Sequence, residues 1–246
     1  MKAIICAAGM GVRLGAETPK ILLEFGGRTL LDWHLLRLRA VSVREVVLVT
    51  GHLHEQITGV LPEAAAAHAL TMREVVNERF HEGSALSVRA ALPEIEGSDN
   101  PILLMDADVL YPAQMIERLV HSSHPTALLL DRDYSTTDDD PVLVAVQNGK
   151  PFEFQKKWSG EADLVGESIG FFKIGAADLP MFCEETRARS AGANVGDSYD
   201  DVLRAMVMAG RFGYEDVTGV PWTEIDFPED AVRARDVVLP AIERLS

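Results

Sequence analysis

The feature that most constrains the fold of this chain is an apolar stretch near the N-terminus that leads directly into glycines. Residues 2–8 are almost all apolar, and Gly9, Gly11 and Gly15 follow within the next seven positions. A short apolar run that ends at a glycine is typical of a buried strand. Glycines directly after a strand let backbone N–H groups approach phosphate oxygens closely. We therefore expect a central strand whose carboxyl end opens a phosphate-binding loop.

Strand-like and helix-like segments alternate through the first half of the chain. Thr29 and Asp32 have the spacing of a capping box, and the apolar residues from Leu31 to Val41 recur at helical spacing. Further predicted helices cover 64–67, 84–92 and 115–120, and further predicted strands cover 45–50, 71–76, 101–105 and 126–130. This alternation predicts an α/β fold with a doubly wound, mostly parallel, Rossmann-like sheet and helices on both faces.

The pattern changes in the second half of the chain. Asn148-Gly149 separates two strand-like segments, 141–147 and 152–157, which predicts a hairpin and hence a small antiparallel β insertion. Strands at 166–174 and 213–218 and helices at 198–209 and 228–245 follow, the last with Pro228 near its start. Because the sequence has no internal repeat and no linker-like composition, we expect residues 1–246 to form one domain.

Composition and charge exclude several classes of partner. The formal net charge is −15, which disfavours non-specific binding to nucleic acid or to anionic membranes. No stretch reaches the roughly 20 apolar residues of a transmembrane helix, and residues 3–8 are too short for a signal sequence. The two cysteines, Cys6 and Cys183, follow no metal-binding spacing and are expected to be buried free thiols. We therefore expect a cytoplasmic protein without nucleic-acid or membrane partners. Whether two copies form a homodimer does not follow from the sequence.

Three kinds of phosphate-binding loop compete for the glycine-rich segment. A Walker loop requires Gly-x-x-x-x-Gly-Lys-Ser/Thr, which the sequence lacks. A dinucleotide-binding loop requires Gly-x-Gly-x-x-Gly and an acidic residue at the end of the second strand. Here the third glycine, Gly15, comes one position late, and the second strand ends in Val49-Thr50-Gly51. The third kind of loop carries cationic residues. In this sequence Arg13 lies in the loop and Pro19-Lys20 closes it.

The stretch from Ala7 to Leu14, followed by Pro19-Lys20, resembles the sugar-phosphate and alcohol-phosphate nucleotidyltransferase superfamily. The resemblance extends to three later segments, 105–109, 166–170 and 224–230. Within that superfamily the chain is most similar to short cytidylyltransferases that act on phosphocholine, 2-aminoethylphosphonate or related compounds. The resemblance implies an enzyme of the nucleotidyltransferase class that uses Mg²⁺.

The resemblance also assigns residues to the nucleotide and the metal. It implies that Asp108 and Asp226 bind Mg²⁺, with Asp106 as an alternate or supporting ligand, and magnesium favours such carboxylates together with phosphate oxygens. It implies that Lys20 contacts the α-phosphate and Arg13 the departing β- and γ-phosphates. The other expected nucleotide contacts are backbone groups of the loop and a segment after the third strand: Ala7, Ala8, Gly9, Gly11, Gly83 and Ser84. Ser84 is equally well placed to cap a helix.

The acceptor site is expected among aromatic and charged residues of the second half. Aromatic faces combined with carboxylates hold amines well, which favours Trp158, Tyr199 and Asp200 as a cage, with Lys157 or its neighbour Lys156 on the acceptor phosphate. The alternative for Trp158 is packing at the end of the hairpin. Glu167 is a further candidate for acceptor binding, which only the resemblance implies.

We therefore expect transfer of CMP from CTP to a small phosphorylated or phosphonated acceptor, with release of pyrophosphate. The choice of CTP follows from the resemblance. The alternatives are a sugar-1-phosphate or methylerythritol-phosphate nucleotidyltransferase, a nucleotide-binding regulator without catalysis, and a nucleotide-dependent oxidoreductase. The missing acidic residue after the second strand disfavours the oxidoreductase.

Overall fold

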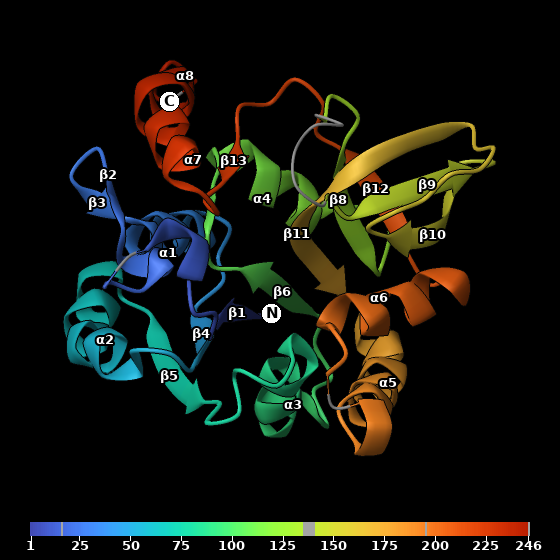
Figure 1. The fold of residues 1–246 in the computed structure, drawn as a ribbon, viewed down its shortest axis with the longest axis horizontal. Coiled ribbons are helices and arrows are strands. Elements are labelled where there is room, and N and C mark those ends of the chain that lie inside the picture. Colours follow the sequence, from blue (N-terminus) through green and yellow to red (C-terminus); the bar gives the residue numbers. More distant parts are fainter. Residues whose placement is uncertain (16, 135–140, 195, 246) are drawn as a thin grey trace.

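The structure is a computed structural model that describes residues 1–15, 17–134, 141–194 and 196–245. Its centre is a mixed sheet in which four parallel strands lie side by side in the order β6-β1-β4-β5 (Figure 1). Their bounds are Lys2–Ala7 for β1, Glu45–Thr50 for β4, Thr71–Val76 for β5 and Ile102–Asp106 for β6. The parallel half of the prediction is therefore confirmed, and β4 and β5 have the predicted bounds.

The long strand β11 (Leu164–Ile174) joins this parallel half to the rest of the sheet. One edge of β11 pairs antiparallel with β8 (Ala127–Asp131). The other edge is shared end to end by β9 (Leu143–Gln147) and β6, both antiparallel. β12 (Gly213–Asp216) adds to β8 in parallel, and β10 (Lys150–Gln155) forms the predicted hairpin with β9. The predicted antiparallel insertion is thus present as the far end of the same sheet.

Helices cover both faces of the sheet because successive strand residues point to opposite sides. On β1, Ala3 and Ile5 pack into one core layer and Ile4 into the other. The first layer contains α1 (Leu30–Ala40), α2 (His54–His68), α4 (Ala113–His121) and the terminal helical segment. The second contains α3 (Ser84–Ile95), α5 (Leu179–Arg189) and α6 (Tyr199–Met208). This confirms the predicted layering.

Several local expectations are met and others are corrected. The capping box of Thr29 and Asp32 at the start of α1 has both of its hydrogen bonds. The predicted terminal helix is three consecutive pieces: α7 (Pro228–Arg233), a π-helical turn (Ala234–Val238) and α8 (Leu239–Glu243). The sequence did not predict the helix α5 or the first ten residues of α2, in which only residues 64–67 were expected to be helical. Cys183 is buried as expected, whereas Cys6 is only half-buried because it lines a cleft.

Short elements complete the fold. β2 (Glu24–Phe25) and β3 (Arg28–Thr29) form a small hairpin, and β7 (Val109–Leu110) pairs antiparallel with β13 (Thr223–Glu224). Short 3-10 turns occur at Val12–Leu14, Lys20–Leu22, Ala176–Asp178 and Gly192–Asn194. Within the described ranges, every helix is too short or too polar to cross a membrane.

Candidate active site

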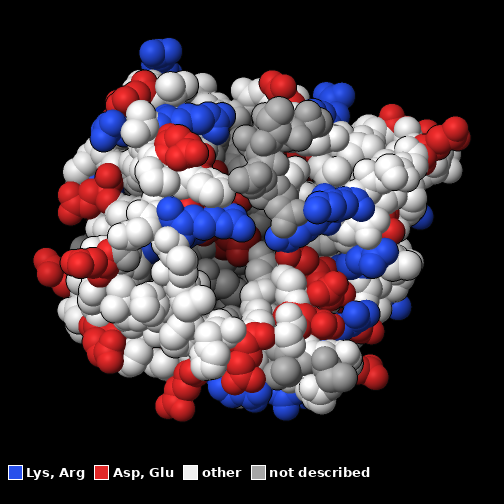
Figure 2. Space-filling view, in the orientation of Figure 1, with Lys and Arg blue, Asp and Glu red and all other residues white. Residues whose placement is uncertain are grey.

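A cleft of about 1110 Å³ lies at the carboxyl ends of β1 and β6. This is where ligands gather in open α/β sheets. Figure 2 shows cationic side chains on both sides of a hollow, with acidic side chains deeper inside it. Most of the predicted site residues line this cleft: Ala7, Ala8, Gly9, Gly11, Arg13, Lys20, Ser84, Asp106, Asp108, Glu167, Tyr199, Asp200 and Asp226. Gly83, Lys157 and Trp158 are not among its lining residues.

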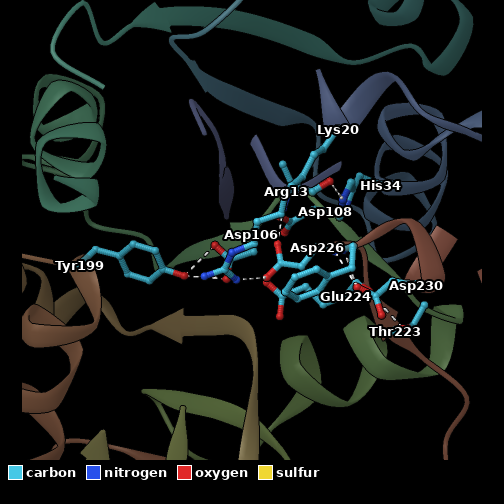
Figure 3. A network of polar contacts seen from close by, with 12 residues as sticks. Arg13, Lys20, His34, Asp106, Asp108, Tyr199, Thr223, Glu224, Asp226 and Asp230 are labelled. Carbon is cyan, nitrogen blue, oxygen red and sulfur yellow. Dashed lines mark hydrogen bonds and ion pairs between the residues drawn. The ribbon is translucent and has the colours of Figure 1, made fainter. Parts of the chain in front are cut away.

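Lys20 lies at the centre of the charged groups. Pro19 precedes the turn that begins at Lys20, and this turn directs the side chain back under the glycine loop. The ammonium donates hydrogen bonds to Asp108 Oδ2 at 2.8 Å and to Asp226 Oδ1. Burial alone would lower the pKa of Lys20, but the charges of Asp108 and Asp226 outweigh it and raise that pKa above its usual range. Lys20 therefore stays positively charged between the two predicted metal ligands (Figure 3).

Three carboxylates converge at this point. Among the described residues, Asp108, Glu224 and Asp226 form one group whose ligand atoms all lie within 4.8 Å of one another. The pairing of β7 with β13 brings them together, because Glu224 lies opposite Val109 and the Ile225 N–H donates to the Asp108 carbonyl at 2.9 Å. The sequence analysis named Asp108 and Asp226 but not Glu224. The sequence signal that could have pointed to Glu224 was its spacing of two residues from Asp226, because side chains two apart in extended chain point to the same side.

Glu224 is surrounded mainly by other acidic groups. Its side chain is exposed toward the cleft and lies close to Asp108 and Asp226. Burial, followed by the negative charges of Asp108 and Asp226, raises the pKa of Glu224 well above its usual value. A cation bound beside these carboxylates would remove that repulsion.

Arg13 is held by the segment that carries Asp226. Its guanidinium forms an ion pair with Asp226 Oδ2 at 3.7 Å and stacks over the ring of Phe227, 5.2 Å from the ring centre. Asp230 fixes this segment, because its carboxylate accepts the N–H groups of Asp226 at 3.0 Å and Phe227 at 2.7 Å. The phosphate-binding loop and the C-terminal segment therefore meet at Arg13.

Asp106 has a different environment from the three-carboxylate group and is not a member of it. The Tyr199 hydroxyl lies 2.6 Å from both of its carboxylate oxygens. Burial, followed by the charge of Asp108, raises the pKa of Asp106 well above its usual value. Gly170 makes room for it, since a Cβ at that position would lie 2.1 Å from Asp106 Oδ2, and the φ of +77° at Gly170 also favours glycine.

His34 supports the same strand end from the opposite core layer. Its Nε2 lies 3.1 Å from the Ala107 carbonyl and its Nδ1 lies 3.2 Å from the Tyr111 hydroxyl. Because a carbonyl oxygen can only accept, Nε2 is the donor and Nδ1 accepts from the tyrosine. Burial lowers the pKa of His34 to about 4, so the ring is neutral at physiological pH. His34 and Tyr199 approach residues 106–108 from opposite sides (Figure 3).

Ser84 links two helices. The residue before α3 is Gly83, and it makes no side-chain cap, while Ser84 is the first residue of the helix. The Ser84 hydroxyl accepts the Tyr199 N–H at 3.0 Å and lies 3.0 Å from the Ser198 hydroxyl, so it supports the start of α6. The sequence analysis missed Ser87, which also lines the cleft and accepts a hydrogen bond from Asn77 at 3.0 Å.

The structure does not bring all residues of the expected cage to the cleft, because Tyr199 and Asp200 line it and Trp158 does not. Trp158 packs against the Phe152 ring, 6.0 Å between ring centres, and lies close over Gly160, so it has the alternative role of packing at the hairpin end. Trp222, which the sequence analysis did not name, lines the cleft instead. Its Nε1 donates to Asp131 Oδ2 at 2.7 Å, which fixes the indole on the β8 side. Lys156 also lines the cleft, whereas Lys157 does not.

Two known proteins are similar to this chain over nearly its whole length. The chain is 29% identical over 244 residues, 96% of its length, to the "Bifunctional IPC transferase and DIPP synthase" of Rubrobacter xylanophilus, and spans 52% of that protein. It is 28% identical over 254 aligned positions, 95% of its length, to the "CMP-5'-(3-aminopropyl)phosphonate synthase" of Streptomyces rubellomurinus, and spans 38% of it.

Among solved structures, the "inositol-1-phosphate CTP transferase from T. maritima" matches the fold with a TM-score of 0.77 at 19% identity. The match covers 99% of this chain and 95% of that one. A family model described as the MobA-like NTP transferase domain matches residues 3–194. The glycine loop, Lys20 and the strand end with Asp108 all lie within the matched range. The chain therefore belongs to the MobA-like NTP transferase family.

Proposed function

We propose that this protein transfers CMP from CTP to a small phosphorylated or phosphonated acceptor, with Mg²⁺ as its metal. One observation carries the proposal: Lys20, directly after the glycine loop, lies between Asp108 and Asp226, which come from distant parts of the chain. A metal-bound triphosphate requires a loop that offers backbone N–H groups, a nearby cation and converging carboxylates, and Lys20 is a half-buried cation at this point.

The donor set fits a divalent cation. Three carboxylates from two segments meet within 4.8 Å, and the Lys20 ammonium already lies as a cation between two of them. Burial, followed by the negative charges of Asp108 and Asp226, raises the pKa of Glu224, so a cation bound beside it would relieve repulsion within the group. Oxygen ligands of this kind suit Mg²⁺. Bound there, Mg²⁺ would neutralise charge on the triphosphate.

The chemistry follows from charge and position. An acceptor phosphate oxygen attacks the α-phosphorus, a new P–O bond forms, and the bond to the β-phosphate oxygen breaks, so that pyrophosphate leaves with the electron pair. A phosphate monoester has its second pKa at about 6, so the nucleophile is already anionic and needs no general base. Lys20 would stabilise negative charge at the α-phosphate and Arg13 at the leaving pyrophosphate. Lys20 must leave at least one carboxylate to do so.

The similarity to a named relative and the lining of the cleft support the choice of nucleotide and of acceptor class. A relative named as a CMP-aminopropylphosphonate synthase favours cytosine and a phosphonate acceptor. At the acceptor end, Trp222, Lys156, Glu167 and Asp200 line one continuous cleft with the metal group. We propose that Trp222 takes the role in acceptor binding that the sequence analysis gave to Trp158.

Pyrophosphate release tests the proposal. The purified protein is incubated with Mg²⁺, each of CTP, UTP, ATP and GTP, and a panel of aminoalkyl phosphonates, phosphocholine, inositol phosphate and sugar 1-phosphates. We expect release with CTP and a small phospho-acceptor. Release only with another triphosphate and a sugar 1-phosphate would support the sugar-nucleotide alternative. No release with any pair, together with measurable nucleotide binding, would support the regulator.

A further inference from the structure

Residues 106–108 are held between side chains from both core layers. His34 of α1 contacts the Ala107 carbonyl from one layer, and Tyr199 of α6 contacts Asp106 from the other. Figure 3 shows the Tyr199 ring pointing along its full length toward Asp106. The metal-binding strand end is therefore attached to a helix that begins 93 residues later in the chain.

The backbone of Tyr199 also forms a hydrogen bond to the segment expected to contact the base. Its N–H donates to the Ser84 hydroxyl, and the neighbouring backbone bond from Ala85 N to the Asp197 carbonyl, 3.2 Å, ties the start of α3 to the segment before α6. A continuous path thus runs from Ser84 through Tyr199 to Asp106. It connects the segment expected to contact the base with the strand end that carries Asp108.

We propose that Tyr199 is a positioning residue, which fixes Asp106, and through it the strand end with Asp108, relative to the nucleotide side of the cleft. This inference rests on the proposed function. It also changes the role of Tyr199, since the sequence analysis placed it in a cage around the acceptor. A hydroxyl that lies 2.6 Å from both oxygens of Asp106 is committed to that carboxylate.

The physical reason is competition for positive charge. Asp106 is close enough to Lys20 and Asp108 for their charges to affect it. The Tyr199 hydroxyl and the space left by Gly170 keep the Asp106 carboxylate turned toward α6. Without the hydroxyl, Asp106 loses its short hydrogen bond and is drawn toward Lys20 and the metal, where it competes with Asp108.

The test is Tyr199→Phe, which removes the hydroxyl and keeps the ring in its packed position. Supporting residues of metal sites typically affect metal affinity or activity by about 10- to 100-fold. We expect kcat to fall about tenfold and the half-saturating Mg²⁺ concentration to rise about tenfold, while the acceptor KM changes less than about twofold. Tyr214→Phe is the matched control, because Tyr214 packs in the same core layer but does not line the cleft.

A second variant makes the result independent of folding defects. Asp106→Asn and the double variant complete a cycle with Tyr199→Phe, and a direct interaction predicts effects that are not additive. Additive effects, or a Tyr199→Phe enzyme with wild-type kcat and Mg²⁺ response, would overturn the proposal. A raised acceptor KM with unchanged kcat would overturn it in favour of the cage.

Failure of the proposed function is distinguished by a binding measurement without turnover. If the wild-type protein releases no pyrophosphate with any pair, calorimetric titration of the nucleotide-free protein with Mn²⁺ decides the inference. Weaker Mn²⁺ binding by Tyr199→Phe than by wild type and Tyr214→Phe would support it. Equal binding, or no Mn²⁺ binding by any of the three, would overturn it.

Discussion

On one side of the cleft, the groups proposed to contact the nucleotide come from a single stretch of chain, β1 and the loop up to Lys20. The opposite side is assembled from distant segments. Asp108 follows β6, Tyr199 begins α6, and Glu224 and Asp226 lie on and just after β13. The first side has its geometry from local backbone rules for glycine and proline. The second has it only after the sheet and both helix layers have formed. The first, continuous side is therefore a single motif in the sequence, whereas the second, assembled side is spread over separate segments.

The largest expected effect comes from the point where the two sides meet. Lys20→Ala should lower turnover by about 100- to 1000-fold, the scale of losing one preorganised donor in a catalytic site. Because the ammonium also occupies the space between Asp108 and Asp226, we expect this variant to bind Mn²⁺ more tightly than wild type in the absence of nucleotide. Steady-state pyrophosphate release and calorimetry measure the two effects. Near wild-type turnover would show that the continuous side does not carry catalysis.

The second prediction concerns the assembled side alone. Glu224→Gln removes one of the three converging carboxylates and should raise the half-saturating Mg²⁺ concentration about 10- to 100-fold. Glu229→Gln is the matched control, because Glu229 lines the same cleft but lies outside the three-carboxylate group. Equal Mg²⁺ responses in the two variants would remove Glu224 from the metal site.

The contrast between the two sides also explains what the sequence could predict. The strands β4 and β5 and the capping box at Thr29 depend on local patterns, and their predictions are confirmed. Glu224 was not predicted because β13 has only two residues. A strand this short shows no alternation of buried and exposed residues by which the sequence could reveal it. The helix α5 was missed although Leu179, Phe182, Cys183 and Thr186 are buried at helical spacing. That residues 1–246 form one domain stays a prediction.

Tyr199 and Trp222 show the limit of sequence reasoning at the site itself. The sequence placed Tyr199 in an acceptor cage, because an aromatic residue next to acids suits an amine. Its hydroxyl contacts Asp106, 93 residues away, and only the pairing of core layers creates that contact. Likewise, Trp222 meets Asp131 across 91 residues. Contacts of this kind depend on tertiary structure.

A third prediction concerns His34, which contacts the strand end of the assembled side through the Ala107 carbonyl. His34 is buried with its pKa lowered to about 4, so the unfolded chain binds a proton that the folded chain rejects. Stability from this group is fully present above its unfolded pKa of about 6.5 and is lost as the pH falls toward 4. The loss amounts to about 2 kcal/mol between about pH 7 and pH 5.

His34→Gln removes this titration, so the free energy of unfolding should fall less steeply with acid than in wild type. Urea unfolding at a series of pH values measures both curves. The difference between the two slopes matters, because Asp106 and Glu224, whose pKa values are raised, act in the opposite direction in both proteins. Parallel curves for wild type and variant would contradict a neutral, buried His34.

The smallest expected effect compares two tryptophans. Trp222→Ala should raise the acceptor KM about tenfold, the scale of losing one aromatic contact, whereas Trp158→Ala should change it less than about twofold. Trp222 lines the cleft and Trp158 packs on Phe152. Kinetics with saturating CTP and varied acceptor measure both values. The reverse order would restore the cage predicted from the sequence.

A crystal structure with CTP and Mn²⁺ tests most directly whether the two sides of the cleft act on one triphosphate. We expect an anomalous Mn²⁺ peak coordinated by Asp108 and Asp226, with Glu224 beside it and the Lys20 ammonium moved onto the phosphates. A triphosphate bound away from the glycine loop, or a metal bound without Asp108 and Asp226, would contradict it.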